Sequence, residues 1–119
     1  MDDSILNSVK KMLGITKDYA VFDQDIIIGI NAALNTLTQI GVGPCGGFFI
    51  TDALTTWDEF LGENPMLEQV KMYVYLKVKQ VFDNDMSGSF SSAVDERIKE
   101  LEWRISVQVD PGDKENYDE

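Results

Sequence analysis

Residues 23–43 read DQDIIIGINAALNTLTQIGVG and predict the central helix of the protein. Their apolar side chains recur every three to four positions, so they fall on one stripe of an α-helix. Asp23 is a good N-cap for this helix, and Phe22 before it can pack on Ile27 one turn later. Gly41 ends the pattern, because glycine readily adopts the left-handed turn that closes a helix. The stripe consists of Ile26, Ile27, Ile30, Ala33, Leu34 and Leu37.

Four further segments have helical apolar patterns, with glycine or proline between them. We expect helices over residues 2–13 and 51–61, a fourth helix that starts at Asn64 and Pro65, and a fifth helix over residues 92–107. Leu54 belongs to the apolar face of the third helix and Val81 to that of the fourth. The fold class is therefore all-α, a small bundle of about five helices that occupies residues 1–109. Its core should contain Ile30, Leu34, Leu37, Trp57, Val74, Val78, Ile98 and Leu101.

The composition is that of one acidic globular domain. The chain has 119 residues, 44% of them apolar, and its formal net charge is −11. Such a surface repels nucleic-acid phosphates. The charge has two readings: it keeps the protein soluble, or it faces or imitates DNA.

No set of residues in the sequence predicts an active site. The chain has no histidine, and no pair of carboxylates lies in an apolar setting that would shift a pKa. We therefore expect no enzymatic activity, no cofactor and no catalytic residue. Cys45 is the single cysteine and cannot form an internal disulfide. No leader and no apolar run of about 18 residues is present, so neither secretion nor membrane insertion is expected.

Two segments are candidates for contacts with another chain. The glycine-rich loop after the second helix either lies under the third helix or packs on a neighbouring chain as an arm. The fifth helix has a second apolar strip, which is either another internal contact or a docking surface. The candidate interface residues are Gly46, Gly47, Phe48 and Phe49 in the loop, and Trp103 and Val107 in the helix.

Two polar segments complete the chain. Asp83 to Ser89 resembles the first half of a calcium loop, but Val94 stands where the bidentate glutamate belongs. A plain interhelical loop is therefore favoured over a metal site, and weak calcium binding stays open. Residues 110–119 are acidic and contain Pro111 and Gly112, so we expect a tail that is disordered when free.

The order and spacing of six segments resemble a known family, the small head–tail connector proteins of long-tailed bacteriophages, also called adaptor or head-completion proteins. The segments cover nearly all of residues 4–109, and none of them is a catalytic signature. They are LGI at 13–15, DQDIIIGIN at 23–31, LTQIGVGP at 37–44, WDEFLG at 57–62, YVYLKVK at 73–79 and ELEWR at 100–104.

The resemblance implies a structural virion protein of a tailed phage. Its copies would form a ring between the portal protein and a downstream stopper, next connector or tail protein. The ring would extend the DNA channel, through which DNA passes without specific binding. The protein would be made in the bacterial host cytoplasm and lie at the head–tail junction. The alternative is a small acidic phage-encoded DNA mimic that inhibits a host factor, but the acids cluster at helix starts and in the tail instead of following one surface.

Overall fold

The protein is an all-α bundle, as expected from the sequence. The computed structural model describes residues 4–44, 46–62, 67–82 and 88–109. Within these ranges it contains five helices and no β-strand, only an isolated bridge between Ser4 and Thr56. The helices are α1 (Ile5–Leu13), α2 (Asp23–Ile40), α3 (Trp57–Leu61), α4 (Leu67–Phe82) and α5 (Gly88–Val109).

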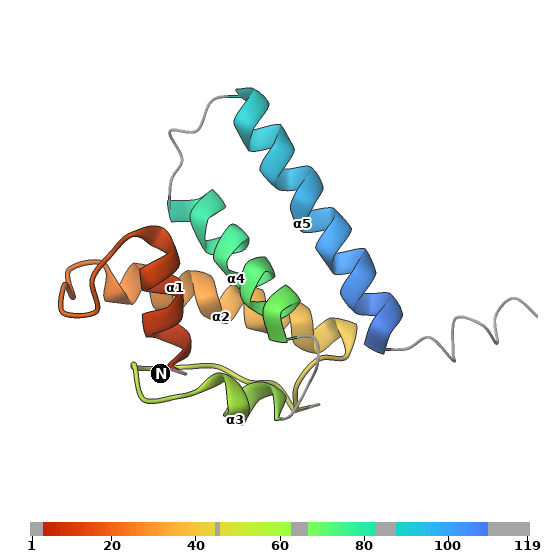
Figure 1. Cartoon of the computed structure of the whole chain (residues 1–119). Helices are drawn as coiled ribbons and strands as arrows, with labels where there is room; N and C mark the ends of the chain where they lie inside the picture. The colour runs from red at the N-terminus through yellow and green to blue at the C-terminus, as the bar shows by residue number, and fades with distance from the viewer. Residues whose placement is uncertain (1–3, 45, 63–66, 83–87, 110–119) are drawn as a thin grey trace, which may run out of the picture.

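Helices α2 and α4 form the centre of the bundle (Figure 1). Each of them contacts the other and also α1 and α5. The two helices approach closely at Gly29, where an added Cβ would lie 3.3 Å from Val78 Cγ2. Figure 1 shows α4 between α1 and α5, with α3 below them. None of the helices in the described part of the chain is long and apolar enough to span a bilayer.

The hydrophobic core is built from the apolar stripes of these helices. All six residues of the α2 stripe are buried. So are Trp57, Val74, Val78, Ile98 and Leu101, the other residues expected in the core. Burying an aliphatic or aromatic side chain stabilises the fold by roughly 1.5–3 kcal/mol. The apolar period of each helix therefore decides which face turns inward.

The third helix is shorter than expected. It begins at Trp57 and not at residue 51, because Thr56 and Glu59 form a capping box at that point. The Thr56 hydroxyl accepts from the Glu59 N–H at 3.3 Å, and the Glu59 carboxylate accepts from the Thr56 N–H at 3.4 Å. Leu54 precedes the helix and is 82% exposed, so its predicted place on an apolar helix face is wrong.

The start of α2 also differs from the prediction. Phe22 occupies the N-cap position, without a side-chain cap, and Asp23 is the first helical residue. Instead of capping, the Asp23 carboxylate forms an ion pair with Lys10, whose Nζ lies 2.8 Å from Asp23 Oδ1. Lys10 is almost completely buried and also donates to the Lys17 carbonyl at 3.0 Å. The ion pair fixes the connection between α1 and α2, since a buried ammonium group needs such acceptors.

Other helix boundaries differ from the predicted ones by a few residues. Helix α1 is capped by Ser4, whose hydroxyl accepts from the Asn7 N–H, and α5 runs from Gly88 to Val109 instead of residues 92–107. The start of the fourth helix at residues 64–65, most of the calcium-like segment and the acidic tail lie outside the described residues.

Candidate functional site

The candidate site is a set of exposed apolar surfaces, since exposed apolar patches mark interaction sites. Most of the large exposed apolar side chains among the described residues gather near the start of α2 and the end of α4. Phe22, Ile28 and Val81 belong to this group and line a hollow of about 460 Å³ together with Asp25, Gly29 and Val78. We call this the α2–α4 hollow. Tyr19 lies beside it, with its ring centroid 5.9 Å from that of Phe22.

Trp103 is a second exposed apolar group. It lies on α5 and is 66% exposed, whereas Val107 one turn later is half-buried. A tryptophan this exposed adds little to the stability of the isolated chain, but it is a common anchor in protein interfaces.

The glycine-rich loop buries some of its apolar residues and exposes another. Phe48 is half-buried and packs on Phe60, with ring centroids 5.0 Å apart. Ile50 is buried, and Asn31 on α2 hydrogen-bonds to both its N–H and its C=O. Phe49 lies between them and is exposed, as are Gly46 and Gly47. The loop is thus fixed to the bundle on both sides of Phe49, which leaves that ring at the surface.

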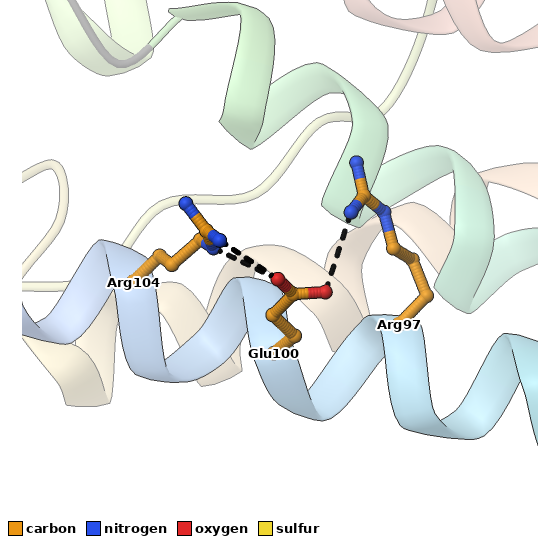
Figure 2. Close-up of polar contacts among 3 residues, drawn as sticks. All are labelled: Arg97, Glu100 and Arg104. Carbon is orange, nitrogen blue, oxygen red and sulfur yellow. Dashed lines mark hydrogen bonds and ion pairs between the residues drawn. The ribbon is translucent and has the colours of Figure 1, made fainter.

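Polar contacts hold the surface of α5 in place around Trp103. Figure 2 shows Glu100 between two arginines of the same helix. Arg104 donates to the Glu100 carboxylate from Nε at 3.0 Å and from Nη2 at 2.9 Å, and Arg97 Nη1 donates to it at 3.3 Å. The hydrogen bond and charge of Arg104, helped by Arg97, lower the pKa of Glu100. These residues are exposed, so the cluster shapes the surface more than it stabilises the fold.

The buried side of α5 is joined to α4 by a polar contact. Tyr73 is buried, and its hydroxyl donates to Glu102 Oε2 at 2.7 Å. Burial first, and then the neighbouring Glu102 carboxylate, raise the pKa of the Tyr73 phenol. The phenol is therefore a neutral hydrogen-bond donor that ties the two helices together.

A second hollow lies between α1 and α4, and its lining is partly basic. Its volume is about 680 Å³, and we call it the α1–α4 hollow. Trp57 forms part of its surroundings: its indole Nε1 donates to Ser8 at 3.1 Å, and Lys71 Nζ lies 6.0 Å from its ring centroid. The lining residues are Asn7, Ser8, Lys11, Met12, Glu68, Lys71 and Met72.

The described residues contain no group of three or more histidine, cysteine, aspartate or glutamate side chains placed to hold a metal ion. Asp83, Asp85 and Ser87, the first ligand positions of the calcium-like segment, lie outside the described residues. Gly88, expected at the turn of that segment, is the first residue of α5.

The sequence analysis missed the α2–α4 hollow. It placed Val81 on the apolar stripe of the fourth helix, but Val81 is 73% exposed. A signal was available in Ile26-Ile27-Ile28, because three successive isoleucines cannot all lie on one helix stripe. Ile28 is the one that turns outward.

Comparison with known proteins shows to which family the chain belongs. A family model described as "Phage connector protein" matches residues 5–112. No curated protein and no solved structure matches the chain. The matched range includes all five helices, the glycine-rich loop and Trp103. The chain therefore belongs to the phage connector protein family.

Proposed function

We propose that the protein is a structural subunit of the head–tail junction of a tailed phage. Its copies form a ring between the portal protein and the tail or next connector, and the ring extends the DNA channel. The observation that carries this proposal is the family match over residues 5–112.

The exposed apolar surfaces support the proposal. A ring with head-to-tail contacts needs two different complementary surfaces on each subunit. The α2–α4 hollow, Phe49 and Trp103 offer apolar contacts on different elements of the chain. Their exposure fits a subunit that buries further surface when it assembles.

The charge of the chain supports a channel role. With a net charge of −11, a ring of copies presents a wall that repels phosphates, so DNA finds few binding positions along it. We expect no catalytic activity and no cofactor in this role.

The test is to mix the purified protein with the portal protein of the same phage genome and to image the complexes by electron microscopy. We expect a ring that is coaxial with the portal. Trp103→Ser should reduce the fraction of portals that carry a ring, whereas Gln108→Ser, at an exposed position of the same helix, should leave it unchanged. Portals that stay bare under several salt conditions would contradict the proposal. A host protein retained by the chain would then favour the DNA-mimic alternative.

A further inference from the structure

The α1–α4 hollow combines positive charge with apolar surface in a strongly acidic protein. Lys11 and Lys71 line it, and neither takes part in the ion pairs formed within the described residues. By contrast, Lys10, Arg97, Lys99 and Arg104 all have carboxylate partners. Neither lysine is therefore neutralised by a direct ion pair within the described residues.

The apolar part of this hollow is made by two methionines. Met12 is exposed and Met72 is half-buried. Methionine side chains are flexible and polarisable, so they adapt to an aromatic or aliphatic group placed on them. Glu68 also lines the hollow, and its carboxylate balances part of the lysine charge. A ligand that suits this lining brings both an apolar group and negative charge.

The C-terminal segment of the chain has this chemistry. Residues 110–119 read DPGDKENYDE, with five carboxylate side chains against one lysine. Tyr117 stands among them and offers a ring with a polar tip. Residues 113–119 lie beyond the range matched by the family model.

We propose that residues 113–119 of one copy bind in the α1–α4 hollow of a neighbouring copy. The Tyr117 ring packs on Met12 and Met72, and the acidic side chains around it pair with Lys11 and Lys71. The inference rests on the proposed assembly of copies and names one contact that holds them together.

The position of the segment favours a neighbouring copy. It follows α5, whose last residue Val109 lies against the end of α2 at Gly41. Figure 1 shows α4 between α1 and α5, and no residue of α5 lines the α1–α4 hollow of its own copy. Ten residues span at most about 33–36 Å when extended, which is enough to reach across a subunit contact. A donor segment and a separate acceptor surface make a head-to-tail contact, the type that closes into rings.

The test is the self-association of the full chain in solution, measured by sedimentation from micromolar to millimolar concentration. Lys11→Glu with Lys71→Glu should weaken association about tenfold, because it reverses the charge that meets the acidic segment. The matched control is Lys17→Glu with Lys77→Glu, which makes the same charge change outside the hollow and should leave association unchanged. Added salt should weaken association of the wild type.

A charge-exchange experiment tests whether misfolding, instead of a lost contact, explains weaker association. Asp118→Lys with Glu119→Lys should also weaken association, and mixing these copies with the Lys11→Glu, Lys71→Glu copies should restore it. The methyl NMR signals of Met12 and Met72 should shift with protein concentration in the wild type and not in the variants. The methyl signals could instead be independent of protein concentration and still differ between the wild type and the tail variant. That result would overturn the inference, because the segment would then bind its own copy. Equal association of wild type and hollow variant would also overturn it.

The two proposals fail separately. If rings form on the portal but the charge reversal does not change self-association, only the tail contact is contradicted. If the portals stay bare but the charge reversal weakens self-association, only the connector function is contradicted.

Discussion

The side chain of Asn31 on α2 forms two hydrogen bonds with the backbone of Ile50. Its Nδ2 donates to the Ile50 carbonyl at 3.0 Å, and its Oδ1 accepts from the Ile50 N–H at 2.7 Å. Ile50 belongs to no helix and is buried, so its backbone groups need partners from elsewhere in the chain. One amide supplies both partners and fixes the loop that carries Phe49.

Asn31→Ala should destabilise the protein by about 1–3 kcal/mol, because it leaves a buried N–H and a buried C=O without partners. Equilibrium unfolding in urea measures this loss. Asn35→Ala is the matched control, since Asn35 lies one turn later on α2 and is exposed. Its effect should stay within about 0.5 kcal/mol. Equal effects of the two substitutions would mean that water replaces the Asn31 contacts.

Gly43 should tolerate no side chain. Its φ is +81°, and an added Cβ would lie 2.4 Å from Cε1 of the buried Phe60 ring. Gly43→Ala therefore combines backbone strain of about 1–2 kcal/mol with displacement of a ring in the core.

Gly47→Ala separates these two causes. Gly47 has a φ of +99°, but an added Cβ meets nothing within 4 Å. Gly47→Ala should cost only the backbone strain, so the difference in urea unfolding free energy between the two variants reports the contact with Phe60. A difference near zero would show that Phe60 turns aside at no cost.

The apolar period of a helix is a local property, and it was enough to predict much of the fold. The stripe from Ile26 to Leu37 is the buried face of α2. The ends of the stripes were harder to predict. Val81 continues the spacing of Val74 and Val78, yet it lies beside Phe22, where α2 begins, and stays exposed. A stripe indicates which face of a helix is apolar, but not how far along the helix a partner covers it.

Contacts between distant residues left no local signal. Nothing near Lys10 in the sequence indicates that it is buried against Asp23, and nothing near Asn31 indicates Ile50. Such pairs depend on the packing of whole helices. The exposure of Trp103 was left open for the same reason: the spacing of α5 placed it off the main stripe, and only the packed bundle shows what covers that face.

Trp103→Ser should leave the stability of the isolated protein within about 0.5 kcal/mol of the wild type, because the side chain is mostly in solvent. Trp57→Ala provides the contrast, since that buried side chain should cost about 3–5 kcal/mol. Thermal unfolding measures both. Val107 is half-buried, so adding Val107→Ser should lower stability more than the Trp103 substitution alone. A large loss from Trp103→Ser alone would mean that Trp103 supports the bundle and would remove it from the docking surfaces.

The stability of the protein should fall at alkaline pH, in part through Tyr73. The pKa of its phenol is raised in the folded state by burial and by Glu102, above its ordinary value of about 10. Between that ordinary value and the folded-state value, the unfolded chain loses the phenol proton while the folded chain retains it. The stabilisation is thus complete below about pH 10 and is lost as the pH rises further.

Tyr73→Phe should lower stability at neutral pH by about 1 kcal/mol through loss of the hydrogen bond to Glu102, and it should reduce the alkaline fall. Urea unfolding at a series of pH values measures both effects. Tyr19→Phe is the control, because Tyr19 is exposed and its substitution should preserve the wild-type profile. The Tyr73→Phe variant has no phenol proton to retain at that position. If its stability falls as steeply at alkaline pH as that of the wild type, other groups cause the fall.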